Sequence, residues 1–227
     1  MRLTRTHIYA TVSTEAHMVK TIEGFVSFLS HYFRNPQAVG AVSALSPAVA
    51  RRLLKYVKAR PDAPCKILEV GAGMGNITRP LVDLLRPGDL LDVVEIDQNC
   101  CQVLENSFQG DPRVCVRHLS IADWNPTYKY DFIISTLPFN VFPSDFLQNI
   151  ITHYEELCMD NGMCAYVEYI GLQKISRLFS KQDKRLMIRK RSSMLKEYHK
   201  KYLIEKSQVF KNIFPCHVYH MQLSKNR

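Results

Sequence analysis

Three glycines spaced two residues apart constrain this chain more than any other stretch of its sequence. They are Gly71, Gly73 and Gly75, and they follow the apolar residues Ile67, Leu68 and Val70. Such residues are typical of a parallel strand that is covered on both faces. Glycine has no Cβ, so the backbone can turn sharply and approach a ligand closely. The helix that follows would present free backbone N–H groups. The stretch therefore predicts a strand, a ligand-binding loop and a helix.

The spacing of the glycines separates two classes of cofactor. A dinucleotide-binding loop follows the pattern G-x-G-x-x-G, and Asn76 stands where its third glycine is expected. The observed pattern E-V-G-x-G-x-G instead resembles motif I of class I S-adenosylmethionine (SAM) methyltransferases. The resemblance implies that Glu69 helps to hold the methionyl part of SAM. We therefore expect Glu69, Gly71, Gly73, Gly75 and Asn76 to bind SAM, with a dinucleotide site and a turn without a ligand as the alternatives.

An acidic residue at the end of the next predicted strand is placed to hold the ribose of the cofactor. The strand is expected over 90–95, and Glu95 follows the glycines by about 20 residues. In nucleotide-binding α/β folds such a residue accepts hydrogen bonds from ribose hydroxyls. We predict that Glu95 and its neighbour Ile96 bind SAM, with a solvent-facing strand end as the alternative for Glu95. Asp97 is expected to cap a helix over 98–108.

The segment after the third predicted strand, 114–117, is expected to reach the adenine. Related enzymes often place an Asp there against the adenine amino group, and by spacing Ser120 takes that position. Ser120 and its neighbour Ile121 are therefore predicted to contact the cofactor. Asp123 lies three residues further on, and it is either the alternative contact or the cap of the short turn that follows.

The fourth predicted strand, 130–135, leads into the loop where a class I methyltransferase presents its substrate to the methyl group. The loop has the sequence S-T-L-P-F. The resemblance implies that the backbone carbonyl groups of Ser135 and Leu137 orient the nucleophile, and that Ser135 also contacts SAM. The other residues of the loop are expected to contact the substrate: Thr136, Pro138 and Phe139.

Three stretches, in the same order, resemble the soluble bacterial phospholipid N-methyltransferases. The first is N-P-Q-A-V-G-A, over 35–41, followed by Ser46; in that family a similar segment lies over the SAM site, which implies a cofactor contact for Ser46. The second is the loop at 135–139. The third, over 211–219, is similar to the closing N-x-P-P-A-x-V-Y. The resemblance implies an N-methyltransferase of a membrane amino-lipid head group, phosphatidylethanolamine-like or ornithine-lipid-like.

The rRNA adenine dimethylase family is the main alternative, because it is similar in motif I and has N-L/I-P-Y/F at the substrate loop. There the Asn side chain and carbonyl groups hold the target amino group, and the aromatic ring stacks on the base. Thr136 stands at the Asn position, which argues against adenine chemistry, whereas Phe139 keeps the stacking option. RNA adenine N6-methylation is therefore the alternative function.

Methyl transfer to an amine adds a requirement, because only the neutral amine is a nucleophile. The pKa of a free amine of this kind is about 10, near that of Lys, so a nearby group must accept a proton. The candidates are Tyr32, in a helix predicted over 15–33, and Glu168, at the end of a strand predicted over 163–169. Each has a structural alternative, Tyr32 as a core residue and Glu168 as a polar group that supports the fold.

The resemblance and the pattern of elements together predict an α/β fold. We expect a doubly wound, seven-stranded class I methyltransferase sheet, mostly parallel, with an antiparallel C-terminal hairpin and helices on both faces. Residues 1–60 are expected to form N-terminal helices that cover the SAM and substrate site, with Ser46 as the cap of one helix. Residues 61–227 are expected to form the SAM-binding core, with a basic helical insertion at 171–206.

Positive charge is concentrated in that insertion. The chain has a net charge of +9, and residues 171–206 alone contain twelve Lys and Arg against three Asp and Glu, which is the same excess. A localised basic face indicates an anionic partner, whereas a solvated helical hairpin is the alternative. We predict an anionic membrane surface and an amino-lipid substrate as partners, with nucleic acid as the second candidate and the oligomeric state open.

Other classes of function find no support in the sequence. No apolar run reaches the roughly 18 residues that span a bilayer, and the N-terminus lacks the apolar core of a signal peptide. The seven cysteines are scattered without C-x-x-C pairs, which favours reduced thiols in a cytoplasmic protein. The resemblance to the phospholipid N-methyltransferases implies a peripheral position on the cytoplasmic membrane face. No metal-ligand pattern, nucleophile elbow or phosphate-cradling loop occurs, so no metal site is predicted.

Overall fold

The computed structural model describes four stretches of the chain: 45–139, 142–170, 182–212 and 214–223. The chain divides into two compact units, 1–44 and 45–227, and the described residues all lie in the second. The N-terminal region predicted over 1–60 is therefore only partly described, and its residues 45–60 belong to the same unit as the sheet. Tyr32 and the segment 171–181 lie outside the described residues.

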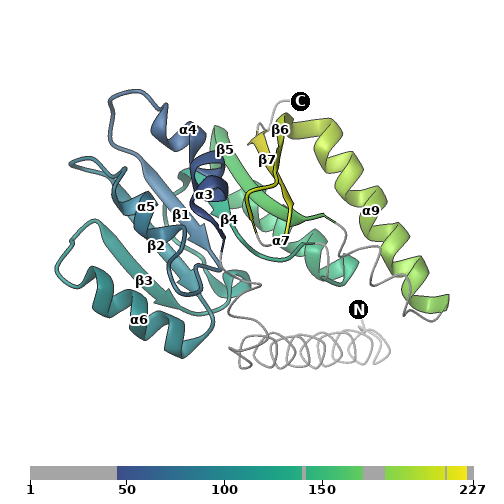
Figure 1. Cartoon of the computed structure of the whole chain (residues 1–227), viewed down its shortest axis with the longest axis horizontal. Helices are drawn as coiled ribbons and strands as arrows, with labels where there is room; N and C mark the ends of the chain where they lie inside the picture. The colour runs from purple at the N-terminus through teal and green to yellow at the C-terminus, as the bar shows by residue number, and fades with distance from the viewer. Residues whose placement is uncertain (1–44, 140–141, 171–181, 213, 224–227) are drawn as a thin grey trace, which may run out of the picture. The chain divides into compact units, whose positions relative to one another are not determined.

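A seven-stranded sheet forms the centre of the described unit (Figure 1). Its strands are β1 (Lys66–Val70), β2 (Leu90–Glu95), β3 (Val114–His118), β4 (Tyr130–Ser135), β5 (Cys158–Tyr169), β6 (Leu203–Val209) and β7 (Cys216–Leu223). They are ordered β3-β2-β1-β4-β5-β7-β6. Six strands point in the same direction, and β7 runs opposite to them, antiparallel to its neighbours β5 and β6. The prediction of a doubly wound, mostly parallel sheet with an antiparallel C-terminal hairpin is confirmed.

Seven helices lie in the described stretches, and capping side chains mark the starts of some of them. They are α3 (Pro47–Leu53), α4 (Lys55–Lys58), α5 (Thr78–Val82), α6 (Gln98–Phe108), the 3₁₀ helix η1 (Ile121–Asp123), α7 (Ser144–Leu157) and α9 (Gln182–Tyr202). The Ser46 hydroxyl accepts from the Val49 N–H at 3.4 Å, and the Asp97 carboxylate accepts from the Cys100 N–H at 2.9 Å, as expected of N-caps. Within the described residues, no helix has the length and apolar character needed to cross a bilayer.

Alternating side chains along β5 and β7 show that helices cover both faces of the sheet. Val167 and Val218 pair across the two strands and belong to the main apolar cluster, which includes residues of α3, α5 and α6. The next pair, Tyr166 and Tyr219, points to the opposite face, because neighbouring side chains in a strand alternate. There Tyr166 stacks on His199 of α9, and α9 packs on α7. The predicted two-sided arrangement of helices is confirmed.

One strand begins before its predicted start, and another begins within the predicted helical insertion. β5 starts at Cys158 rather than at residue 163, because the turn at Asn161 is an irregularity within the strand. Asn161 has a φ of 63°, and the register of β5 against β4 shifts between Tyr130 and Phe132, as in a β-bulge. β6 starts at Leu203, because residues 203–206 pair with β7. These residues therefore belong to the sheet rather than to the helical insertion.

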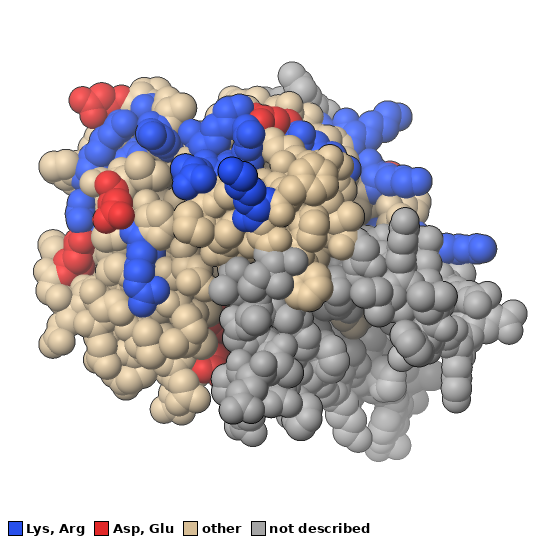
Figure 2. Space-filling model, viewed as in Figure 1, with Lys and Arg blue, Asp and Glu red and all other residues tan. Residues whose placement is uncertain are grey.

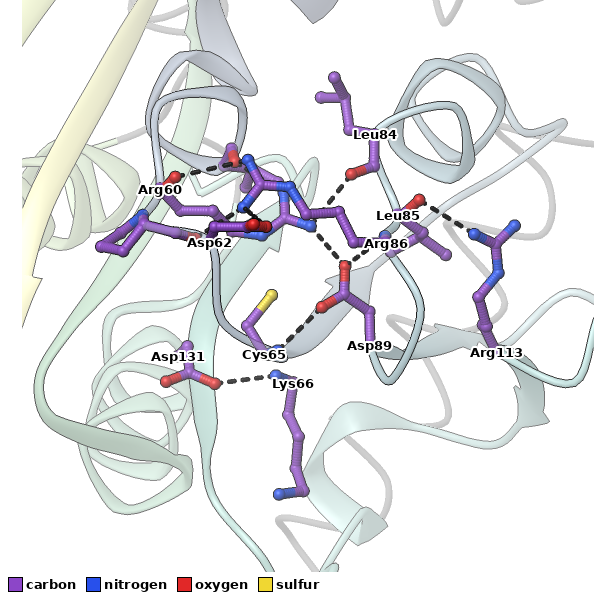
Figure 3. A network of polar contacts seen from close by, with 12 residues as sticks. Arg60, Asp62, Cys65, Lys66, Leu84, Leu85, Arg86, Asp89, Arg113 and Asp131 are labelled. Carbon is purple, nitrogen blue, oxygen red and sulfur yellow. Dashed lines mark hydrogen bonds and ion pairs between the residues drawn. The ribbon is translucent and has the colours of Figure 1, made fainter.

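A buried ion pair fastens the edge of the sheet where the parallel strands begin. Arg60 and Asp89 contact each other with side chains 3% and 0% exposed. Asp89 also accepts hydrogen bonds from the Cys65 N–H at 2.8 Å and the Arg86 N–H at 2.7 Å (Figure 3). Arg60 also donates to the Leu84 carbonyl at 3.0 Å. The pair thereby joins the turns that lead into β1 and β2, far along the strands from the glycine loop.

Candidate functional site

The glycine loop lies where the strand order reverses. β1 pairs in parallel with β2 on one side and with β4 on the other, so the loops after β1 and β4 emerge side by side. We call this edge, where the parallel strands end, the carboxyl edge. In open α/β sheets ligands bind at such a position. The Gly71 N–H donates to the Val94 carbonyl at 2.9 Å and the Thr136 N–H donates to the Val70 carbonyl at 3.0 Å, which ties the loops to the neighbouring strands.

The three glycines of the loop all have positive φ, 75° at Gly71, 54° at Gly73 and 84° at Gly75. Residues with a side chain rarely adopt this conformation. A Cβ on Gly71 would lie 2.9 Å from Leu137 Cδ2, and one on Gly75 would lie 3.0 Å from Leu104 Cδ2. A Cβ on Gly73 would meet nothing within 4 Å. The loop is therefore packed at its two ends and open in its middle, which fits a cradle for a cofactor.

Glu69 is buried at the end of β1 without a hydrogen-bond partner in the described residues. Its side chain is 0% exposed, and both of its carboxyl oxygens and the Thr78 hydroxyl lack a partner. Burial raises the pKa of Glu69 to about 8. The neighbouring Thr78 hydroxyl acts to lower this pKa, although it makes no hydrogen bond with the carboxyl. An orphaned buried carboxyl is costly and calls for a ligand that completes it. Its oxygens fit the positively charged methionyl amine of SAM, in agreement with the predicted role.

Glu95 organises the other side of the glycine loop from the end of β2. Its Oε2 accepts from the Gly73 N–H at 2.7 Å, and its Oε1 accepts from the N–H groups of Ile96 at 2.7 Å and Asp97 at 2.9 Å. A carboxylate can accept about four hydrogen bonds, so one position remains on Oε2. This geometry fits one ribose hydroxyl directly. A second hydroxyl would have to replace one of the backbone donors.

The remaining predicted cofactor residues stand in the expected loops, but two of them have structural partners. Ser120 caps η1, accepting from the Ala122 N–H at 3.3 Å, and Ile121 is buried. The Ser46 hydroxyl donates to the Lys211 carbonyl at 2.5 Å, so it ties the start of α3 to the end of β6. Ile96 and Asn76 are both exposed. Their contacts with the cofactor stay predictions.

The loop after β4 packs directly against the glycine loop. The Thr136 hydroxyl donates to the Gly71 carbonyl at 2.5 Å. The buried Ser135 hydroxyl accepts from the Tyr154 hydroxyl at 3.0 Å, and the Leu137 carbonyl accepts from the Phe139 N–H at 2.9 Å. The predicted nucleophile-orienting residues are thus brought next to the predicted cofactor residues, as a transfer reaction between two ligands requires.

Comparison with known proteins agrees with this geometry. A family model described as "Ribosomal RNA adenine dimethylase" matches residues 44–156. An ornithine lipid N-methyltransferase of Singulisphaera acidiphila is 23% identical over 148 residues, which cover 62% of this chain and 76% of that protein. The chain is a class I SAM-dependent methyltransferase. It is related to the rRNA adenine dimethylases, and its cofactor is SAM.

Two further matches define how far the likeness extends. The small-subunit rRNA methyltransferase A of Sulfurimonas denitrificans is 28% identical over 95 residues. These residues cover 39% of this chain and 34% of that relative. An O-methyltransferase from Bacillus cereus, solved with S-adenosylhomocysteine, superposes with a TM-score of 0.61 at 16% identity, covering 86% of this chain and 90% of that one. At this identity the superposition shows the shared class I fold.

The methyltransferase buries Phe139 in an aromatic cluster that the sequence did not predict. Phe139 is 0% exposed, and its ring centre lies 4.7 Å from that of Tyr166 and 6.2 Å from that of Tyr154. The Tyr166 hydroxyl contacts His199 Nε2 at 2.5 Å, and burial lowers the pKa of His199 to about 4, so its imidazole is neutral. Strand alternation could have placed Tyr166 on the face of Glu168. His199, 33 residues further on, gave no local signal.

Helix α9 contacts Phe142, which follows the substrate loop (135–139), and the first turn of α7. The buried Arg191 donates to the Phe142 carbonyl at 2.9 Å, and Lys190 pairs with Asp145 at 2.7 Å. Glu168 accepts from the Tyr219 hydroxyl at 3.1 Å on the same face of the sheet. Glu168 therefore contacts the aromatic cluster through Tyr219, whose ring stacks on that of Tyr166. Its predicted catalytic role remains a hypothesis. The other predicted acceptor, Tyr32, lies outside the described residues.

The open middle of the glycine loop predicts a separation of binding from stability. Gly73→Ala should cost only about 1 kcal/mol of unfolding free energy, the strain of a left-handed residue with a Cβ. Its methyl group would enter the space predicted for SAM, so SAM affinity should fall more than tenfold, by roughly 1.4 kcal/mol or more. Calorimetric titration with SAM and denaturant unfolding measure the two effects.

Gly110→Ala is the matched control for this change. Gly110 has a φ of 90° and, like Gly73, nothing within 4 Å of an added Cβ. It follows α6, outside the predicted site. It should therefore show a similar stability cost and unchanged SAM affinity. If Gly73→Ala and Gly110→Ala bind SAM equally well, the middle of the loop does not contact the cofactor.

Proposed function

We propose that the methyltransferase transfers methyl groups to the amine of a membrane amino-lipid head group. Support comes from the lipid enzyme of Singulisphaera acidiphila, whose match extends over 76% of that protein, whereas the match to the rRNA enzyme of Sulfurimonas denitrificans covers 34% of it. The three lipid-enzyme-like stretches of the sequence, at 35–46, 135–139 and 211–219, occur in the same order as in the phospholipid N-methyltransferases. We also propose that the enzyme works at the cytoplasmic face of a membrane, where such a substrate is found.

Thr136 is the observation that carries this proposal. It stands where the rRNA adenine dimethylase motif has the Asn that holds the target amino group. A hydroxyl has one hydrogen to donate, and that of Thr136 goes to the Gly71 carbonyl at 2.5 Å. The Thr136 side chain is thus fastened to the glycine loop and has neither the reach nor the free donor for an adenine edge. The burial of Phe139 in the aromatic cluster also argues against stacking on a flipped base.

The chemistry asks little of the side chains beyond alignment and proton removal. SAM supplies a methyl group that its sulfonium already activates. The chain must hold the amine in line with that methyl group and exclude water. The Leu137 carbonyl, which already accepts one hydrogen bond, retains a lone pair to orient the amine, together with the Ser135 carbonyl. Of the two residues predicted to accept the amine proton, Tyr32 and Glu168, only Glu168 lies in the described part of the chain.

Adenine methylation of RNA is the second candidate, because the family model that matches residues 44–156 is that of the rRNA adenine dimethylases. The test compares the two acceptors with labelled SAM. The protein is incubated with detergent-dispersed phosphatidylethanolamine or ornithine lipid, and separately with unmodified rRNA. We expect label in an amino-lipid and none in RNA. Label in RNA with none in any amino-lipid would refute the proposal. Mass spectrometry of lipids from expressing cells identifies the head group.

A further inference from the structure

A shallow groove lies between α3 and the end of β6. Its volume is about 470 Å³, and the residues that matter for its chemistry are Arg51, Arg52, Lys55, Val209, Phe210 and Lys211. We call it the α3–β6 groove. One wall carries the cations of α3 and α4, and the other carries the ring of Phe210, which is 68% exposed. Figure 2 shows Lys and Arg side chains gathered over α3 and α4 on this side of the molecule.

The charge of the α3–β6 groove is only partly balanced. Glu205 contacts Lys55 at 2.5 Å and Arg52 at 3.7 Å. Among the described residues, the side chains of Arg51 and Lys211 have no acidic partner. Unpaired cations on both walls of one groove favour an anionic ligand that can lie between them.

Helix α9, which carries much of the chain's excess charge, offers a weaker case. Arg191 is buried and donates to a backbone carbonyl, and Lys190 is paired with Asp145. Lys201 lies over the ring of Tyr202, with its Nζ 4.6 Å from the ring centre. Arg191 and Lys190 thus hold the helix to Phe142 and to the first turn of α7, and Lys201 contacts a ring of its own helix. The sequence alone pointed to this segment, whereas the structure directs attention to the α3–β6 groove.

The α3–β6 groove opens at the same edge of the sheet as the SAM loop. β6 runs parallel to β1 and β4, because both β5 and β6 are antiparallel to β7. Phe210 and Lys211 therefore follow β6 at the carboxyl edge. Further apolar side chains in loops at this edge are exposed, Met74 by 52% and Ile170 by 37%. Cations next to exposed apolar side chains are typical of surfaces that lie on an anionic bilayer.

We propose that the α3–β6 groove binds the phosphate groups of an anionic bilayer and thereby turns the carboxyl edge toward the lipid head groups. Arg51 and Lys211 contact phosphate, and Phe210 reaches the boundary with the acyl chains. The inference rests on the proposed function, since a lipid acceptor has to be reached from a membrane. It adds the surface that docks and the orientation of the active site.

Charge argues against the N-terminal residues of this chain as the occupant of the groove. Residues 1–44 contain four Lys and Arg and two Asp and Glu, so their net charge is positive. A positive segment does not complement a positive groove. RNA is also a polyanion, and it is an outcome that the experiment below separates from the bilayer.

The test removes the two unpaired cations of the α3–β6 groove. The full chain carrying Arg51→Gln and Lys211→Gln is compared with one carrying Lys196→Gln and Lys200→Gln, two exposed positions on α9. Both variants lose the same charge. Sedimentation measures binding to phosphatidylglycerol-containing vesicles, with phosphatidylcholine vesicles as the uncharged reference. Each basic residue near an anionic surface contributes about fivefold to binding, so the groove variant, which lacks two of them, should bind roughly 30-fold more weakly. The α9 variant should change much less, and both should bind SAM like the natural chain.

Two outcomes would overturn the inference. One is an equal loss of vesicle binding in both variants, or no loss in either. The other is an RNA oligonucleotide that binds more tightly than the vesicles and depends on the same two residues. Transfer to detergent-dispersed amino-lipid separates this result from the proposed function. If that transfer persists while vesicle binding ignores the groove, the inference fails and the function stands. If vesicle binding needs the groove but no amino-lipid accepts a methyl group, the inference stands and the function fails.

Discussion

Replacing Glu69 by Gln is expected to raise the stability of the SAM-free methyltransferase while weakening its hold on SAM. Glu69 is fully buried, and neither carboxyl oxygen has a partner in the described residues. Gln has nearly the same shape as a protonated Glu but cannot ionise. The variant therefore keeps the packing of the site and removes the cost of a buried acid, which must take up a proton on folding or bury its charge.

The sign follows from the pKa of the folded state. Burial raises the pKa of Glu69 from 4.5 to about 8. Between pH 4.5 and 8 the carboxyl is ionised in the unfolded chain but protonated in the folded protein. Folding then requires the uptake of a proton, so the natural protein loses stability as pH rises through this range. The slope is about 1.4 kcal/mol per pH unit, and the accumulated cost is about 3 kcal/mol at pH 7. Glu69→Gln escapes this cost.

Binding should change in the opposite direction. A hydrogen bond to a charged group contributes about 1.5–3 kcal/mol, so loss of the carboxylate should weaken SAM binding about 10- to 150-fold. The measurements are denaturant unfolding of both proteins without SAM at pH 5, 7 and 8.5, and calorimetric titration with SAM at pH 7.5. The stability gap should widen with pH. A gap that stays constant, or unchanged SAM affinity, would contradict the role given to Glu69.

Glu105→Gln serves as the matched control. Glu105 is exposed on α6, and the substitution removes the same charge from the chain. Its unfolding free energy and its affinity for SAM should both follow those of the natural protein at every pH. The comparison separates the effect of a buried, orphaned carboxyl from a general effect of net charge.

Local patterns in the sequence were sufficient to predict the turn of the glycine loop and the start of the helix after β2. The spacing of Gly71, Gly73 and Gly75 predicts a sharply turned loop, and all three residues have a positive φ. Asp97 was expected to cap the helix that follows β2, and it does so. These predictions succeed because a turn, a cap and the end of a strand are each determined by residues close together in the chain.

The substrate half could not be derived in the same way, because its partners come together through tertiary packing. Tyr166 contacts His199 across 33 residues, and Arg191 reaches Phe142 across 49. Phe139 was expected to contact the substrate, but its ring is enclosed by residues of β5 and α7. The charge of the α9 segment has the same limit: a count of Lys and Arg does not show that Arg191 is buried against the Phe142 carbonyl, and the predicted anionic partner of this segment stays a prediction.

The buried ion pair of Arg60 and Asp89 also forms through tertiary packing, so its contribution to stability could not be predicted from the sequence. Nothing in the sequence near either residue signals the other, 29 positions away. Burial alone would raise the pKa of Asp89, but hydrogen bonds from the Arg86 and Cys65 N–H groups and the charge of Arg60 lower it. The carboxylate is therefore ionised in the folded state, at the centre of the network in Figure 3.

Asp89→Asn should destabilise the methyltransferase by about 3–5 kcal/mol, because it leaves the Arg60 guanidinium buried without a counter-charge. Asp62→Asn is the control: Asp62 meets Arg86 at 3.4 Å but is 98% exposed, so the change should stay within about 0.5 kcal/mol. Denaturant unfolding at pH 7 measures both. Because the pKa of Asp89 is lowered on folding, its contribution is present above about pH 4 and is lost as pH falls further. The gap between natural protein and Asp89→Asn should therefore hold from pH 7 to 5 and narrow below 4; a loss under 1 kcal/mol would mean that the pair does not secure this edge of the sheet.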